Sequence, residues 1–441
     1  MKKDFFFQNN RRFFSGLWKK ALILLAVFGP ATITAMADND AGGVATYSIA
    51  GAKLGYSILF LLPVITLLLA ITQEMGMRLT IITRRGLADL IREKYGVRAA
   101  LFMFIALLIA NIGTLVTEIS AIRTTSEMFN IPPTPAIIAI VLISFVFITR
   151  GNYKLTQNIM LLACFFFLAY IFSAVKASPD WGLAISNLFY PHDPIVSAYT
   201  PIKFQAYMGD YLIIGMGVLG TTITPWGQFF ISSFAYDKKI EKGKVGLSQL
   251  ETYWGAFLTD FFSFFMIVAT AAALFAGGKG LLNGLDAAQA IKPIAGPLAG
   301  QLFALGILNA GFMGLVVVSL STAYAFAEFF GVSGSLDDSF KKSKVFYFLY
   351  IIQLVVATSL VLIFSGISLF QVAVVTQIIN AVALPLVFYY LIKLTNDRSL
   401  MGEYVNNAFQ KWFAVACTIV IVITSAATVV FSVWDTFFKI K

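Results

Sequence analysis

Long apolar stretches follow one another along most of this chain of 441 residues. Most are about 20 residues or longer, the length that an α-helix needs to cross the hydrocarbon core of a membrane. Lipid offers the backbone no hydrogen-bond partners, so stretches of this length predict membrane-spanning helices. The chain is therefore expected to be an all-α polytopic membrane protein with eleven spans, at approximately residues 21–50, 56–82, 99–128, 135–150, 157–177, 206–235, 250–276, 298–330, 345–366, 370–394 and 411–436.

Basic residues lie mainly in the short loops beside these stretches and give a net charge of +10. Such loops favour the cytoplasmic side, where they contact anionic lipid head groups, so the bilayer and not nucleic acid is the expected partner. The N-terminus is then cytoplasmic, the C-terminus is extracellular, and the plasma (cell inner) membrane is the expected location. The predicted segments are a cytoplasmic N-terminal segment 1–19, a first five-helix repeat 20–177, an extracellular loop 178–205, a second five-helix repeat 206–396, and a linker with the eleventh span 397–441.

The first span is interrupted by Asp38, Asn39 and Asp40, followed by the glycine pair 42–43. A carboxylate at bilayer depth costs roughly 2.5 to 3.5 kcal/mol, and paired glycines weaken the helix. Irregular backbone at that depth is tolerated only where protein or a water-filled cavity covers it. We therefore expect a discontinuous helix that binds a cation. Because a helix turns about 100° per residue, Asp38 and Asn39 cannot share the direction of Asp40 if the segment stays helical.

A second interruption lies in the sixth span, where glycine and threonine residues precede Pro225. Proline removes a backbone donor and clashes with the preceding turn, so a break is expected between Thr222 and Pro225. Interrupted helices five spans apart indicate a transporter built from two inverted five-helix repeats, with its binding site at their interface. The eleventh span lies outside this repeat.

The sequence contains no nucleophile–base pair, nucleotide loop or thiolate cluster, so neither an enzyme nor a cofactor is expected. Glu74 and Arg78 are four residues apart and can form an ion pair on one helix face. Glu118 and Asp260 lie within spans and are further candidates for a cation or water path.

Several local motifs resemble the Nramp family of divalent-metal transporters. The resemblance implies a LeuT-type fold, a 5+5 inverted repeat with broken helices 1 and 6, plus an eleventh helix. It extends over roughly the first ten spans. The matching positions are Gly29 and Pro30; Ala45, Thr46, Ala50 and Gly51; Gln73, Glu74, Met75 and Arg78; residues 86–93; Leu384 and Pro385; and residues 400–406.

The departures from the family pattern concern the metal ligands. Family members usually carry Asp-Pro-Gly-Asn in the first broken helix, where residues 40–43 keep Asp40 but end in Gly43. They usually carry Met-Pro-His in the sixth, where this chain has Thr224, Pro225 and Trp226. Without the thioether, the remaining oxygen ligands suit Mg²⁺ and Mn²⁺, and Mg²⁺ typically keeps several waters. The chain thus resembles the Nramp-related magnesium transporter branch, which carries Mg²⁺ and also Mn²⁺.

Within this resemblance each site residue has an expected role. Asp40 supplies the charge, Gly43 supplies volume, and Trp226 forms cavity wall. Thr224 either contacts the ion or its water, or bonds back to its own helix. Asp38 either lines the cavity or lies outside it, and Asn39 is a further candidate. By resemblance to the family site, the remaining groups expected to face the ion are the backbone carbonyls of Ala37 and Thr221 and, on closure, the side chain of Gln377.

Proton coupling is expected to be absent. Trp226 replaces the family histidine and Leu115 replaces an expected acidic position, which leaves Glu118 without a titrating partner. We therefore predict an uncoupled secondary transporter that functions as a monomer. The alternatives are a proton-coupled Mn²⁺/Fe²⁺ symporter of the Nramp type, a sodium-coupled organic-solute carrier of the LeuT type, and a cation channel or transport-dead metal sensor.

Overall fold

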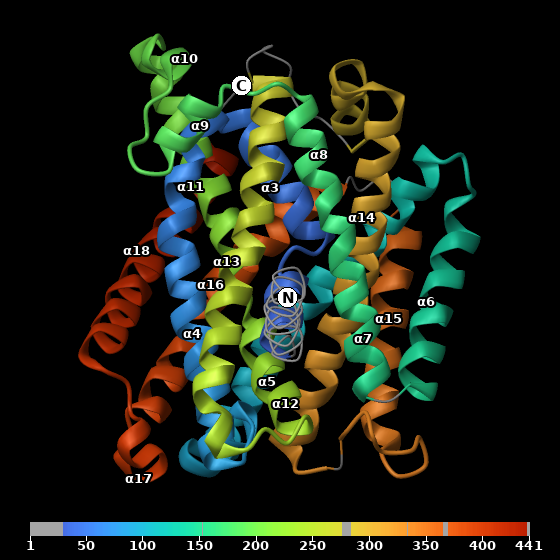
Figure 1. Cartoon of the computed structure of the whole chain (residues 1–441), viewed down its shortest axis with the longest axis vertical. Coiled ribbons are helices and arrows are strands. Elements are labelled where there is room, and N and C mark those ends of the chain that lie inside the picture. The colour runs from blue at the N-terminus through green and yellow to red at the C-terminus, as the bar shows by residue number, and fades with distance from the viewer. Residues whose placement is uncertain (1–29, 152, 276–283, 333, 365–368, 439–441) are drawn as a thin grey trace, which may run out of the picture.

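The structure is a computed structural model that describes all residues except 1–29, 152, 276–283, 333, 365–368 and 439–441. The described regular structure is helical, and most long helices run along the long axis of the molecule (Figure 1). The helices are α2 (Pro30–Ala37), α3 (Ala41–Leu54), α4 (Leu61–Thr83), α5 (Leu87–Met128), α6 (Pro133–Arg150), α7 (Tyr153–Ala163), α8 (Leu168–Lys176), α9 (Trp181–Asn187), α10 (Pro194–Ser197), α11 (Pro201–Thr222), α12 (Pro225–Asp237), α13 (Val245–Thr270), α14 (Gly284–Phe330), α15 (Lys344–Ile363), α16 (Leu369–Thr395), α17 (Arg398–Met401) and α18 (Ala408–Phe438).

Among the described residues, 9 helical segments are long and apolar enough to cross a membrane. This number is compatible with eleven predicted spans, because the first two join into the continuous segment Ala41–Thr83 and the fifth is divided into two helices that are too short to be counted. The fifth span is interrupted by a 3₁₀ turn, Cys164–Phe167, between α7 and α8. The all-α polytopic prediction is confirmed. The predicted segment 1–19 and the span residues 21–29, 276 and 365–366 lie outside the described residues.

Both helix breaks lie where the sequence predicted them. In the first, α2 ends at Ala37 and α3 begins at Ala41. In the second, α11 ends at Thr222 and α12 begins at Pro225. Proline suits the first turn of a helix because its missing N–H would have no helical partner there.

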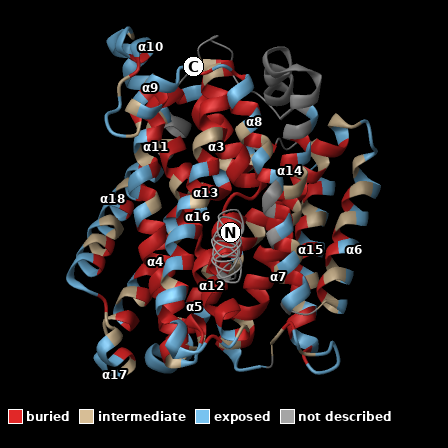
Figure 2. Cartoon of the chain, in the orientation of Figure 1, coloured by how far each residue is buried: buried red, intermediate tan, exposed pale blue. Residues whose placement is uncertain are grey.

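The broken helices occupy the interior of the bundle. Helix α3 packs against α11, α13, α14 and α16, and Figure 2 shows buried residues concentrated along these central helices. By contrast, only 22% of the apolar window of α6 and 22% of that of α18 is buried. These two helices lie on opposite sides of the molecule (Figure 1). Their exposed apolar faces are those expected to contact lipid.

Three loops meet at one end of the bundle, around a cavity of about 700 Å³. The cavity is lined by Arg84 and Arg85 after α4, Lys239 after α12 and Lys342 before α15. The charge pattern predicted that these three loops lie on the same side of the membrane, and the structure places them together. The short helices α9 and α10, from the predicted extracellular loop, lie at the opposite end (Figure 1).

Candidate cation site

Two carboxylates cap the start of α3. The backbone amides of Ala41 and Gly42 donate to the side chain of Glu118 on α5, at 3.0 and 3.3 Å. The amide of Gly43 donates to Oδ1 of Asp40 at 2.7 Å. Negative groups are stabilised at a helix N-terminus by the free N–H groups and by the helix dipole. Glu118 therefore holds the second half of the broken helix in place.

The same arrangement releases backbone oxygens. In a continuous helix, the first three amides of α3 would bond to the carbonyls of residues 37–39, four positions earlier. The carbonyls of Ala37 and Asp38 thus lose their helical donors. In the second break, Pro225 has no N–H, so the carbonyl of Thr221 also lacks a donor four residues later. Ala37 and Thr221 are the two carbonyls that the sequence predicted to face an ion, and both residues are fully buried.

Potential ligand oxygens gather beside Gly43. A Cβ atom placed on Gly43 would lie 2.9 Å from the Asp38 carbonyl oxygen, 3.0 Å from the Thr221 hydroxyl and 3.5 Å from Oδ1 of Asp40. Oδ2 of Asp40, the Thr221 hydroxyl and Nε2 of Gln377 are buried and have no hydrogen-bond partner in the described part of the chain. Buried polar groups are normally satisfied, so this group of atoms is suited to contact a bound ion and its waters.

Gly43 lies close to oxygens of both helix breaks. The sequence suggested that Gly43 leaves volume for a hydrated ion, but in the structure a Cβ at this position would meet oxygens of Asp38 and Thr221 at 2.9 and 3.0 Å. A side chain there would push these oxygens apart. The absence of a side chain at Gly43 therefore allows the two breaks to approach each other closely.

Thr224 contacts both its own helix and Asp38 of the first break. Its hydroxyl donates to Oδ1 of Asp38 at 3.0 Å and accepts from the amide of Gly227 at 3.0 Å, so it caps α12. The other oxygen of Asp38 accepts from Nε2 of Gln73 on α4 at 3.1 Å. Asp38 is fully buried and lies between the two breaks. Sequence reasoning ranked it below Asp40, because helical periodicity says nothing about residues in the break itself.

Asn39 and Trp226 form hydrogen bonds with neighbouring helices. The Asn39 amide donates to the carbonyl and hydroxyl of Thr259 at 2.9 and 2.7 Å, and its oxygen accepts from Ser263 at 2.9 Å. Both ends of Asn39 are thus used to fix the break to α13. Trp226 is fully buried in the first turn of α12, and its carbonyl accepts from Ser321 at 2.8 Å. Its indole N–H has no hydrogen-bond partner among the residues that the structure describes.

Four carboxylates around the first break have no basic partner. Asp38, Asp40, Glu118 and Asp260 are all buried, and none lies within 4.0 Å of a Lys, Arg or His nitrogen among the described residues. Burying uncompensated charge is costly, so these groups need bound cations or protons. The described residues contain no group of three or more His, Cys, Asp and Glu side chains arranged to hold a metal. Carbonyl and hydroxyl oxygens would have to complete a cation site here.

Comparison with known proteins identifies the family. The family described as natural resistance-associated macrophage protein-like matches residues 31–431. The chain belongs to the Nramp family. Among curated Nramp relatives, a divalent metal cation transporter MntH of Pediococcus pentosaceus is 25% identical over 433 residues, covering 93% of this chain and 91% of that protein. The MntH of Levilactobacillus brevis is 25% identical over 431 residues, covering 92% and 88%.

Solved structures confirm the fold. The Eremococcus coleocola manganese transporter superposes with a TM-score of 0.71 at 19% identity and covers 96% of this chain and 90% of that one. A Na⁺-coupled sialic acid symporter superposes with a TM-score of 0.55 at 13% identity, covering 90% and 89%. The predicted Nramp membership and LeuT-type fold are confirmed. The family consists of transporters, so the prediction that the chain is not an enzyme is also confirmed.

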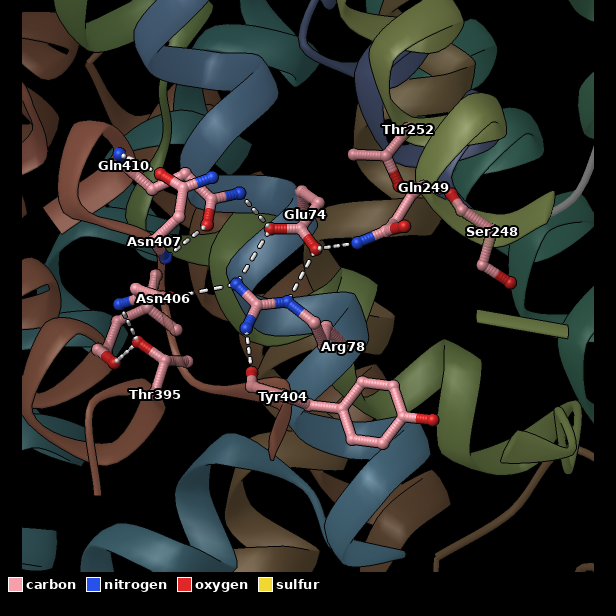
Figure 3. Close-up of polar contacts among 11 residues, drawn as sticks. Glu74, Arg78, Ser248, Gln249, Thr252, Thr395, Tyr404, Asn406, Asn407 and Gln410 are labelled. Carbon is pink, nitrogen blue, oxygen red and sulfur yellow. Dashed lines mark hydrogen bonds and ion pairs between the residues drawn. The ribbon is translucent and has the colours of Figure 1, made fainter. Parts of the chain in front are cut away.

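Two Nramp motifs, at 73–78 and 400–406, meet in one buried network (Figure 3). Nε of Arg78 contacts Oε1 of Glu74 at 2.6 Å, which confirms the predicted pair. Gln249 and Gln410 also donate to Glu74, at 2.8 and 3.0 Å, and Arg78 donates to the carbonyl of Tyr404. The network ties α4 to α13, to α18 and to the loop after α17. Its charges are fully satisfied by one another, so these residues stabilise the fold and have no free group for an ion.

Proposed function

We propose that this Nramp protein is a secondary transporter of hydrated divalent cations, chiefly Mg²⁺ and also Mn²⁺, which works by alternating access without proton coupling. The observation that carries the proposal is the set of oxygens beside Gly43, drawn from both helix breaks. The names of the MntH relatives and of the Eremococcus coleocola manganese transporter support a divalent cation as substrate.

The donor atoms favour a hard ion. Released carbonyls, the Thr221 hydroxyl and one free Asp40 oxygen are all oxygen donors. Carboxylate, carbonyl and water oxygens suit Mg²⁺ and Mn²⁺, whereas the thioether that favours softer metals is replaced by Thr224. Because Mg²⁺ dehydrates reluctantly, a site with a single carboxylate suits an ion that keeps several of its waters.

Gln377 can join this site by turning its amide. In the structure its Oε1 accepts from Nδ2 of Asn380 at 2.7 Å, while its Nε2 points toward Gly42, 2.5 Å from the position of a Cβ there. Oδ1 of Asn380 has no partner in the described residues. If both amides turn together, they keep a mutual hydrogen bond and present the Gln377 oxygen to the ion.

Two features near the site support transport without proton coupling. The family histidine is replaced by Trp226, which does not titrate, and Glu118 is held by two backbone amides as a helix cap. A double charge moving through 100 mV gains about 4.6 kcal/mol, twice the roughly 2.3 kcal/mol of a single charge. The membrane potential is therefore sufficient to drive inward flow.

We also propose that the end of the bundle where the three basic loops meet is cytoplasmic and that a monomer in the plasma membrane is the functional unit. The clustering of Arg84, Arg85, Lys239 and Lys342 supports this orientation.

Purified protein in liposomes with an internal pH dye tests the coupling. An inward Mg²⁺ gradient with an inside-negative potential is expected to drive Mg²⁺ uptake without internal acidification. Metal-driven acidification that disappears in Asp40→Asn would instead establish the proton-coupled symporter. Sodium-dependent uptake of an organic solute with no effect of Mg²⁺ would favour the LeuT-type alternative.

A further inference from the structure

The two aspartates of the first break lie on different sides of it. Asp40 is held at the start of α3 next to Glu118 of α5, and its Cβ lies 2.9 Å from the position of a Cβ on Gly314 of α14. Asp38 instead bonds to Gln73 of α4 and Thr224 at the start of α12. The side chain of Asp38 therefore faces α4 and α12, while the carbonyl oxygen of the same residue is one of the oxygens beside Gly43.

A second carboxylate lies on the α4–α13 side. Asp260 of α13 is 4% exposed and accepts through Oδ2 from the hydroxyl of Thr66 on α4. The carboxylate of Asp38 is within electrostatic reach of Asp40 and of Asp260. Thr66 and Gln73 are seven residues apart, which places them on the same face of α4, about 10 Å apart along its axis. One face of α4 therefore positions both aspartates.

Two buried oxygens on this side have no hydrogen-bond partner among the described residues. One is Oδ1 of Asp260. The other is Oε1 of Gln73, which is 0% exposed and belongs to the amide whose nitrogen contacts Asp38. The amide oxygen of Gln73 can itself be a cation ligand, and leaving it buried without a hydrogen bond is costly.

The groups that face this pair provide no positive charge. They are Gln73 and Thr66 from α4, Thr224 from the start of α12, and the hydroxyl of Tyr47 from α3, which bonds to Thr222 at 2.7 Å. No Lys, Arg or His nitrogen lies within 4.0 Å of either aspartate in the part of the chain that the structure describes. Two negative charges with oxygen donors and no basic partner match one divalent cation.

We propose that Asp38 and Asp260, with Gln73, form a second binding site for a hydrated divalent cation, distinct from the site at Asp40. Thr66 and Thr224 already hold the side chains of Asp260 and Asp38. Because Thr66 and Gln73 are two helical turns apart on α4, an ion that retains its waters fits between the aspartates better than a bare ion. This inference rests on the proposed substrate class. An ion can then pass from one side of the break to the other by exchanging Asp38 for Asp40 as its carboxylate ligand.

The test counts Mn²⁺ ions bound to the full chain in nanodiscs of zwitterionic lipid, from the EPR signal of the free aqua ion. Wild-type protein is expected to bind two Mn²⁺ per chain. Asp260→Asn and Asp38→Asn, which keep the size of the side chain, are each expected to lower the number to one. Glu127→Gln, which removes a carboxylate half-exposed at the end of α5, is the matched control and is expected to leave it at two. Elution volume and thermal unfolding establish that each variant is folded.

The outcomes separate this inference from the proposed function. Loss of one ion in Asp40→Asn and of the other in Asp260→Asn supports both. Two ions in Asp40→Asn but one in Asp260→Asn would keep the second site and contradict the Asp40 site. A single Mn²⁺ in wild-type protein, an unchanged number in folded Asp260→Asn, or loss of both ions in that variant would overturn the second site.

Discussion

Asparagine in place of Asp40 would remove the charge of the proposed cation site while keeping the local fold. Oδ1 of Asp40 accepts from the Gly43 amide at 2.7 Å and caps α3. Asparagine caps a helix about as well as aspartate, whereas alanine loses about 1 kcal/mol of cap stabilisation. Asp40→Asn therefore tests the charge, and Asp40→Ala tests charge and cap together.

The size of the effect follows from the free oxygen of Asp40. Oδ2 has no hydrogen-bond partner in the described part of the chain, so in the proposed complex it accepts a hydrogen bond from a water on the ion or contacts the ion itself. A hydrogen bond to a charged group contributes about 1.5 to 3 kcal/mol. At about 1.4 kcal/mol for each factor of ten, loss of the charge is expected to weaken Mg²⁺ binding about 10- to 150-fold.

The assay is Mg²⁺ uptake into proteoliposomes as a function of Mg²⁺ concentration, with thermal unfolding measured on the same preparations. The half-saturating concentration is expected to rise by the same factor in Asp40→Asn and Asp40→Ala, while only the alanine variant unfolds at a lower temperature. Glu127→Gln serves as the carboxylate control. Uptake of folded Asp40→Asn with the half-saturating concentration of the wild type would refute the assignment of Asp40.

Three further variants test neighbouring features. In Gly43→Ala the new Cβ would lie 3.0 Å from the Thr221 hydroxyl, so we expect slower uptake and a loss of about 1 to 3 kcal/mol in unfolding free energy; wild-type uptake would show that the two breaks need not approach so closely. Arg78→Leu leaves Glu74 buried without its partner and is expected to lower the free energy of unfolding by about 3 to 5 kcal/mol, part of which Glu74→Gln should restore in the double variant. Equal melting temperatures for the wild type, the single variant and the double variant would exclude a stabilising pair. Thr224→Met introduces a soft ligand and is expected to raise the ratio of Mn²⁺ to Mg²⁺ uptake; an unchanged ratio would place selectivity elsewhere.

The sequence predicted the features that depend on local chemistry. Polar residues and glycines in an apolar run located the first break, and Pro225 located the second within three residues. The spacing of Glu74 and Arg78 predicted their ion pair, since residues four apart share a helix face. Family motifs added the LeuT-type fold, which the solved structures confirm.

Contacts between distant segments could not be predicted in this way. Glu118 caps α3 across 77 positions of sequence, and Asn39 bonds to α13 more than 200 positions later. The pairing of Asp38 with Thr224 likewise depends on how the two breaks meet. Periodicity describes which face a residue takes within one helix, but it contains no information on which helix lies opposite. The division into two five-helix repeats at 20–177 and 206–396 stays a prediction.

The central claim is that Mg²⁺ crosses the membrane through the Asp40 site without a proton. Its most direct test is the rate of Mg²⁺ and Mn²⁺ uptake into liposomes, each at an acidic and a neutral external pH with the membrane potential held constant. The account predicts saturable uptake of both ions, abolished or strongly weakened in Asp40→Asn, at rates that an imposed proton gradient does not accelerate. Uptake of Mn²⁺ alone, accelerated by external acid, would contradict it.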